Sequence, residues 1–398
     1  MAASGMLLAS PSADAYTARW VGSHDAWAPL LPVWRAVHRR YTPSDLGSDP
    51  AWCEGTEAAY PGAVKLLTLF RGGELAVVVP FLLLRSPIDC RLGEYNVVRF
   101  RPRLLLPAGE EPALGGDAEA WNSAFSALLS PPAALDFDVL RVAAPTASGL
   151  WTLLQGTSWR RLGLCPYEPA APVLHQRIAM PETFEAYAAK FSAKTRGNRN
   201  RELKNLKQRG AVELACYREA GEIEVFLQQA MAISRRSYQH RLLNAGMPEP
   251  ERLRPRLAVA AREGWLRSYV LRCGGAPCSY MLGYQYGGRY HYMAVGYDPV
   301  WKQFSVGTVL QMLVLQEMFQ HDPPEVFDFG VAAPQKEYFG NQSFEEATLL
   351  LFRRGIYPWL IRQLHRGSRQ ATQAAAQILE HYQLRVPVQQ FLRRVRGC

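Results

Sequence analysis

The sequence lacks the signals of several common protein classes. Its seven cysteines form no C-x-x-C pair and its eight histidines are not spaced as metal ligands, so neither a zinc site nor a disulfide framework is expected. It has no G-x-x-x-x-G-K motif, which argues against a nucleoside triphosphatase, and no serine with the His-Asp pattern of a catalytic triad. No run approaches the ~18 apolar residues of a membrane span, and the first residues lack a charged leader. We therefore expect a metal-free protein of the reducing cytoplasm.

Acidic residues are scarce relative to basic ones. The chain has 45 lysines and arginines against 35 acidic residues, a net charge of +10. This excess suggests an acidic partner such as a polyphosphate cofactor, an RNA or an anionic membrane, although a solvated basic surface explains it equally well. The 398 residues, 48% of them apolar, suffice for two domains or one large domain with a sizeable core.

The most informative stretch holds three β-rich runs in succession. The runs 265–273, 277–286 and 289–297 are separated by glycine pairs, which is the spacing of an antiparallel meander with tight turns. Apolar residues at helical spacing predict a helix over 306–319, and a buried strand over 326–329 follows it.

The start of that helix is the predicted anion-binding site. A helix N-terminus carries unpaired backbone N–H groups and the positive end of the helix dipole, so it can hold a pyrophosphate with few cationic side chains. Ser305 is available there as the N-cap. The residues predicted to contact the ligand, called the donor turn below, are Lys302, Gln303, Ser305, Val306, Gly307 and Thr308.

These motifs resemble those of the GNAT acyltransferase superfamily. Lys302-x-x-Ser305-x-Gly307 is a degenerate version of its phosphate-binding turn. The sequences GYDP (296–299), FDFG (327–330) and a lysine-aromatic-FG stretch (336–340) surround that turn in the order typical of the CelD-type and Fem-like branch. The resemblance spans roughly residues 180–355 by pattern. It implies acyl-CoA, such as acetyl-CoA, as co-substrate and no metal.

The resemblance also implies an α/β (α+β) fold with two GNAT-like lobes, each a mixed, largely antiparallel sheet flanked by helices. We assign residues 1–178 to a degenerate N-terminal lobe and residues 179–355 to the acyltransferase lobe. Residues 356–398 are predicted to form a basic helical tail of short amphipathic pieces. We interpret the tail as a clasp packed on the lobes. The alternative is attachment to an anionic membrane or to another protein.

A basic helical segment, residues 181–208, precedes the acyltransferase lobe. Its composition alone favours a solvated helix face. The related proteins, however, carry a similar basic helix just before the catalytic lobe. We therefore predict that Lys194, Arg196 and Arg199 bind an anionic ligand.

Acyl transfer needs groups that move protons, and the candidates lie at or after the last strands: Asp298 follows the run 289–297, Asp328 lies within the FDFG strand, and Lys336 and Tyr338 come after it. The position of Tyr338 matches the GNAT tyrosine that protonates the leaving sulfur, and Asp298 and Asp328 are the candidate carboxylates. Lys336 is the candidate for substrate binding. Each has a structural alternative: Tyr338 as an aromatic plug of the core, Asp298 as a turn residue before proline, and Asp328 as a brace for backbone or an arginine.

Together these features predict an N-acyltransferase that moves an acyl or acetyl group from acyl-CoA to an amine. An amino sugar, a lipid amine, an amino acid and a protein amine are all open as acceptors, and polysaccharide or cell-envelope metabolism is a suitable setting. One alternative is a Fem-like aminoacyl transferase that uses charged tRNA. Another is an inactive accessory protein of polysaccharide assembly. The expected location is the cytoplasm, with peripheral contact to the inner face of the membrane as an option.

Overall fold

The structure is a computed structural model that describes residues 16–22, 24–41, 45–93, 95–109, 118–129, 135–237, 247–331 and 334–381. In the first half, a long hairpin of aliphatic residues, β2 (Val64–Arg71) and β3 (Glu74–Arg85), contributes much of the core. The other elements of this half are β1 (Thr17–Val21), α1 (His24–Trp27), α2 (Leu31–Tyr41), α3 (Pro50–Ala59), β4 (Ile88–Leu92), β5 (Tyr95–Phe100), β6 (Arg103–Pro107), α4 (Ala118–Leu129), β7 (Val139–Pro145), α5 (Gly149–Gly156), β8 (Leu164–Tyr167) and β9 (Val173–Ala179).

The second half contains the predicted meander, now β11 (Ser268–Cys273), β12 (Ala276–Tyr286) and β13 (Arg289–Tyr297). Both glycines of each connecting pair have positive φ, as tight hairpin turns require. The other elements are α6 (Phe184–Ala188), α7 (Ala193–Lys207), β10 (Val212–Tyr217), α8 (Ile223–Arg236), α9 (Pro250–Arg262), the 3-10 segment η5 (Pro299–Phe304), α10 (Val306–His321), β14 (Val326–Val331), α11 (Pro334–Phe339), β15 (Gln342–Arg353) and α12 (Ile356–His381).

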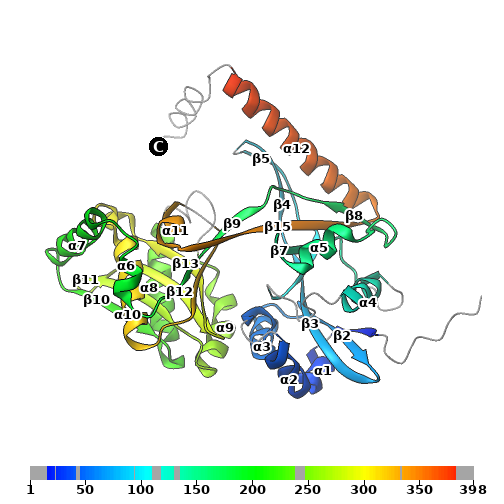
Figure 1. The fold of residues 1–398 in the computed structure, drawn as a ribbon, viewed down its shortest axis with the longest axis horizontal. Helices are drawn as coiled ribbons and strands as arrows, with labels where there is room; N and C mark the ends of the chain where they lie inside the picture. The colour runs from blue at the N-terminus through cyan, green and yellow to red at the C-terminus, as the bar shows by residue number, and fades with distance from the viewer. Residues whose placement is uncertain are drawn as a thin grey trace, which may run out of the picture.

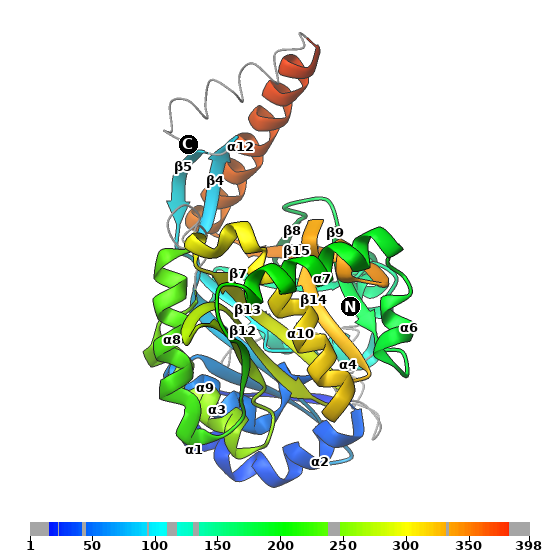
Figure 2. The same cartoon turned by 90° about the vertical axis from the view of Figure 1, so that its left-hand side faces the viewer.

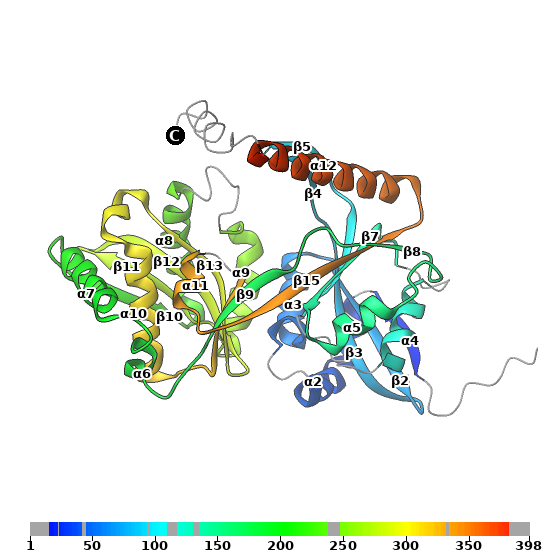
Figure 3. The ribbon, with the colours of Figure 1, turned by 45° about the horizontal axis from the view of Figure 1, so that its top comes forward.

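One sheet joins the two lobes. Among the described residues it has 13 strands in the order β1-β2-β3-β6-β7-β15-β9-β14-β13-β12-β11-β10, and β8 pairs with β15 beside this path. The long strand β15 pairs with β9 through its first residues and with β7 and β8 through its later ones, so it crosses from one lobe to the other (Figures 1 and 3). The predicted α/β (α+β) fold with two lobes is confirmed.

The strand β15 belongs to both lobes, which matters for the predicted domain limits. The prediction placed β15 in residues 179–355, whereas its pairing with β7 and β8 ties it to the first half as well. The division at residues 178 and 355 therefore stays a prediction.

Helices cover both faces of the second-lobe sheet. Successive residues of β11 point to opposite faces, so Tyr269 and Leu271 pack with α10 while Val270 packs with α8 and α9. Figure 2 shows α8 and α9 on one side of these strands and α10, α6 and α7 on the other. Both faces of β11 and β12 are thus mostly buried, whereas β13 is partly exposed, with Met293 51% exposed.

The tail differs from its prediction. Instead of short pieces, one helix, α12, runs to His381, and residues 382–398 lie outside the described residues. Pro358 sits in the first turn, where no intrahelical hydrogen bond is lost. Gly367 costs the helix only ~1 kcal/mol relative to alanine, and packing against β4 and β15 offsets that cost. No described helix has both the length and the apolarity needed to cross a membrane.

Candidate active site

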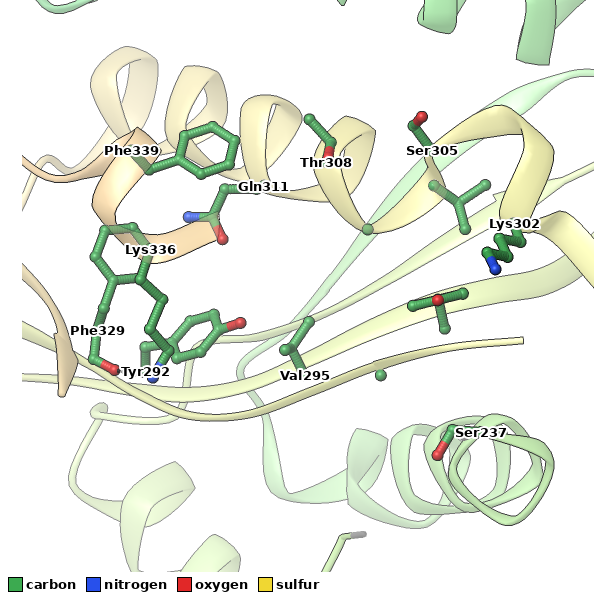
Figure 4. A pocket seen from close by; sticks show the side chains of 14 residues that line it. Ser237, Tyr292, Val295, Lys302, Ser305, Thr308, Gln311, Phe329, Lys336 and Phe339 are labelled. Atoms are coloured by element: carbon green, nitrogen blue, oxygen red, sulfur yellow. Dashed lines mark hydrogen bonds between the residues drawn. The ribbon is translucent and has the colours of Figure 1, made fainter. Parts of the chain in front are cut away.

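The sheet opens at the centre of the second lobe. β13 and β14 are parallel neighbours only from Arg289–Val326 to His291–Asp328, and beyond these pairs the two strands diverge. A cavity of about 450 Å³ occupies the opening (Figure 4). Its lining residues come from β13, η5, α10, β14 and α11, together with one residue after α8: Tyr292, Val295, Gly296, Tyr297, Lys302, Ser305, Val306, Gly307, Thr308, Gln311, Phe329, Lys336, Phe339 and Ser237.

The donor turn forms one end of this cavity. Five of its six predicted residues line the cavity and Gln303 does not. Ser305 occupies the N-cap position of α10, as predicted, but it adopts a left-handed conformation with φ of 53° and its hydroxyl makes no capping hydrogen bond. The Thr308 N–H already donates to the Ser305 carbonyl oxygen at 2.8 Å, so among the described residues the N–H groups of Val306 and Gly307 are the ones at the helix start without an intrahelical acceptor. They stand at the positive end of the helix dipole, an arrangement that suits a phosphate.

The other end of the cavity holds two polar side chains among aromatic rings. Gln311 is 5% exposed, and its Nε2 is buried with no hydrogen-bond partner in the part of the chain that the structure describes. Lys336 donates from Nζ to the carbonyl oxygens of Phe329 at 2.6 Å and Val331 at 2.9 Å. Burial lowers the pKa of Lys336, and the nearby Asp328 partly opposes that shift. Figure 4 shows Gln311 and Lys336 on the same side of the cavity as Tyr292.

Sequence reasoning missed Gln311 and Tyr292. The signal for Gln311 was a lone amide within the apolar helix, whose neighbours Leu310 and Val314 are fully buried. Tyr292 follows the last residue of β13 that pairs with β14. Burial raises the pKa of its phenol, so the hydroxyl stays protonated.

Tyr338 does not line the cavity. Its ring stacks on Phe191 with centroids 5.0 Å apart, and the guanidinium of Arg199 lies 5.0 Å from the ring centroid. Arg199 also donates from Nε to the Tyr338 hydroxyl at 3.4 Å. These contacts match the structural alternative of an aromatic plug, and the catalytic role of Tyr338 stays a prediction.

The two carboxylates make structural contacts outside the cavity lining. Asp298 is 4% exposed, accepts from the Val300 N–H and pairs with Arg236 at 3.0 Å. Asp328 accepts from the Gly330 N–H at 2.7 Å and lies 3.7 Å from Arg289. A turn and a brace are the structural alternatives named for them, and their catalytic roles stay predictions.

The basic helix α7 packs beside η5 and α10. Lys194 is exposed, Arg196 donates to the carbonyl oxygen of Phe191, and Arg199 pairs with Glu202 at 2.7 Å. None of the three lines the cavity. The described residues contain no cluster of three or more side chains that could hold a metal, and the expected absence of a metal stays a prediction.

Comparison with known proteins identifies the family that the second lobe resembles. Residues 193–340 match the family model described as the acetyltransferase (GNAT) domain. The chain carries a GNAT domain. The donor turn, Gln311 and Lys336 all lie within it, as do both walls of the cavity.

Over 80% of its length, the chain also shares its fold with a solved structure. The crystal structure of FemX superposes with a TM-score of 0.54 at 9% identity, covering 80% of this chain and 95% of that chain. A tandem GNAT protein from the clavulanic acid biosynthesis pathway gives a TM-score of 0.47 at 11% identity, covering 86% of this chain and 99% of that chain. No curated protein matches in sequence. The likeness to FemX shows that the GNAT domain belongs to a two-lobed, Fem-like fold.

Proposed function

We propose that this protein transfers an acyl group from acyl-CoA to an amine. The observation that carries the proposal is the cavity between the diverging strands β13 and β14, with the uncapped start of α10 at one end. A pyrophosphate at the donor turn would accept hydrogen bonds from backbone N–H groups and would lie at the positive end of the helix dipole. The rest of the donor would then extend along the cavity towards Gln311 and Lys336.

The polar residues of the cavity suit the chemistry of acyl transfer. The amine attacks the thioester carbon and loses a proton, the carbonyl oxygen gains charge, and the leaving sulfur takes up a proton. Gln311 Nε2, which is buried and has no hydrogen-bond partner among the described residues, can donate to a carbonyl oxygen of the acyl donor. The Lys336 ammonium has three N–H donors, two of which bind backbone carbonyls, so one remains for a ligand.

A ligand screen tests this function. The folded chain would be heated with acetyl-CoA, with longer acyl-CoAs and with aminoacyl-tRNA, because a ligand bound only by the folded state raises the melting temperature. We expect acyl-CoA to stabilise the protein. Release of the CoA thiol would then be followed with amino sugars, amino acids, lipid amines and peptides as acceptors. Failure of every acyl-CoA to stabilise the chain would refute the proposal.

The FemX-like fold and the basic face of α7 favour a second candidate, a Fem-like transfer from charged tRNA. Lys194, Arg201 and Lys204 are exposed. Replacing all three with glutamine would weaken tRNA binding and reduce its salt dependence if α7 binds RNA. An unchanged salt response would leave α7 as a solvated face. Binding of charged tRNA without binding of acyl-CoA would favour this candidate over the first.

The remaining alternative is an inactive accessory protein of polysaccharide assembly. The observation that favours it is Ser305, which occupies a left-handed position where glycine is the unstrained residue. Binding of acyl-CoA without turnover on any amine would support it. Assignment to the CelD-type branch, a polysaccharide or cell-envelope setting and a cytoplasmic location are likewise proposals.

A further inference from the structure

The helix α12 and the β4–β5 ribbon project together from the lobes (Figure 2). One face of α12 is packed. Ile361 is fully buried, His365 Nδ1 lies 2.8 Å from the Tyr167 hydroxyl, and Thr372 donates to the carbonyl oxygen of Arg91. The helix is therefore held in place along several turns.

The opposite face of α12 is exposed and apolar. Ile356 is 86% exposed and Trp359 54%, and Leu360 and Leu364 are also exposed. Residues 356, 360 and 364 follow one another at intervals of four and so form a stripe on one face. Exposed Gly367, Ala371 and Ala374 extend the same stripe without a charge. We call residues 356, 359, 360 and 364 the apolar stripe.

Positive charge borders this stripe. Arg362 and Arg366 lie one turn apart on the flank next to Trp359, and Arg353 and Arg354 precede the helix. Glu380 is the single acidic residue after Glu346 in the sequence. A second cavity, of about 460 Å³, lies at the base of the helix between Phe352, Ile356 and Trp359, with Arg353, Arg354 and Arg362 around it. The surface thus combines apolar walls with arginines at their edge.

We propose that the apolar stripe docks on a membrane that contains anionic phospholipid. An amphipathic helix with aromatic and aliphatic residues beside arginines lies in the interface between headgroups and acyl chains. Tryptophan is enriched at that depth, and each arginine near an anionic surface adds to the attraction. The cavity beside Trp359 suits the upper part of an acyl chain, with the arginines near the phosphate.

Charge disfavours the other occupants of the stripe. Residues 382–398 contain four arginines and no acidic residue, so folding them over the stripe would bring like charges together. A second copy of the chain would likewise bring its own arginine flank against this one. An anionic lipid surface neutralises the arginines. The proposal does not depend on the acyl-transfer function.

Flotation of the full chain with lipid vesicles tests the proposal. Vesicles of phosphatidylcholine alone are compared with vesicles that also contain phosphatidylglycerol. We expect binding to the anionic vesicles only, and weaker binding as salt is added, because screening shortens the range of the charge attraction. No binding, or equal binding to both kinds of vesicle, overturns the proposal.

Two variants separate the apolar and the basic contributions. Ile356→Gln with Trp359→Gln and Leu364→Gln removes the stripe, and Arg362→Gln with Arg366→Gln removes the flank. Each should weaken binding at least about tenfold. The matched controls are Val33→Gln with Val225→Gln, two equally exposed valines elsewhere, and Arg39→Gln with Arg235→Gln. Both controls should bind as the parent does.

Three results contradict the proposal in different ways. If the stripe variant binds as well as the parent while a chain ending at residue 381 does not bind, the tail is the lipid contact. If sedimentation shows a dimer that the stripe variant dissociates, a second copy covers the stripe. If the controls lose as much binding as the variants, the attraction is not specific to α12.

Discussion

The Lys336 ammonium lies 5.5 Å from the centre of the Tyr292 ring. Because Lys336 also donates to the carbonyl oxygens of Phe329 and Val331, this one side chain links α11, β13 and the end of β14. It lies at the point where the two strands have separated, at the end of the cavity away from the donor turn. A ligand that fills the cavity must therefore pass close to a half-buried positive charge.

The first prediction uses the titration of that charge. Burial lowers the pKa of Lys336, so its positive charge is lost at a lower pH than for an ordinary lysine of pKa ~10.4. Affinity for CoA should therefore fall as the pH rises towards the lowered pKa. Lys336→Arg keeps the charge and should flatten this fall, whereas Lys207→Arg on the exposed face of α7 should not. Isothermal titration calorimetry across that pH range measures the affinity for CoA. Identical pH profiles of affinity for the parent and Lys336→Arg would contradict the prediction.

A second prediction concerns Gln311. An unsatisfied buried amide costs ~1–3 kcal/mol, so Gln311→Leu should leave the melting temperature of the free protein unchanged or raise it. The same substitution should weaken acyl-CoA binding about tenfold, which is one lost hydrogen bond. A lower melting temperature with unchanged affinity would show that Gln311 serves the fold rather than the ligand.

The third prediction asks which tyrosine donates a proton. A lost catalytic acid costs ~10²-fold or more in turnover, whereas a lost packing hydroxyl costs stability and leaves the turnover of folded molecules nearly intact. Because Tyr292 lines the cavity and Tyr338 contacts Phe191 and Arg199, we expect the larger loss in Tyr292→Phe. Turnover and melting temperature are measured on the same preparation. A ~10²-fold loss in Tyr338→Phe alone would restore the role predicted from its sequence position.

A fourth prediction concerns acid stability. Burial lowers the pKa of His291 to about 4, helped by Arg289 and opposed by Asp328. The unfolded chain binds a proton here near its ordinary pKa of ~6.5 and the folded chain does not, so stability is lost as the pH falls from about 6.5 to about 4. The shift corresponds to about 3 kcal/mol.

Urea unfolding at several pH values measures this loss. His291→Gln should make stability less dependent on pH in that window, and the half-exposed His24→Gln should behave as the parent. If the parent and His291→Gln lose stability equally between pH 6.5 and 4, the buried histidine is not the cause.

Local patterns predicted much of the second lobe and little of its side-chain geometry. The glycine pairs and the apolar run of α10 determine structure within a few residues of themselves, so the meander and the helix could be predicted from the sequence. The path of β15 depends on pairing with β7, which is about 200 residues away in sequence, and no local pattern encodes it. Helix α9 was missed because Pro255 lies within it, and its packing against α3 outweighs the lost hydrogen bond.

The residues of the candidate site were also only partly predictable from the sequence. The donor turn follows from a helix start, which sequence reveals, whereas the rotation of the short helix α11 decides that Lys336 lines the cavity and Tyr338 does not. A six-residue helix has too few periodic positions to predict its inward face. The conformation of Ser305 was equally hidden, because serine is an ordinary N-cap residue and gives no sign of a left-handed backbone.

Binding of CoA to a donor-turn variant tests the central claim most directly. Among the described residues, a Cβ atom at Gly307 would meet only the Tyr297 ring, at 3.8 Å, so Gly307→Val should fold while its side chain blocks approach to the first N–H groups of α10. Gly156→Val in α5 is the matched control, since a Cβ there has no neighbour within 4 Å. By calorimetry, the parent and Gly156→Val should bind CoA alike and Gly307→Val at least about tenfold more weakly, because the backbone can no longer contact the pyrophosphate. Equal affinity in a folded Gly307→Val protein would contradict the account.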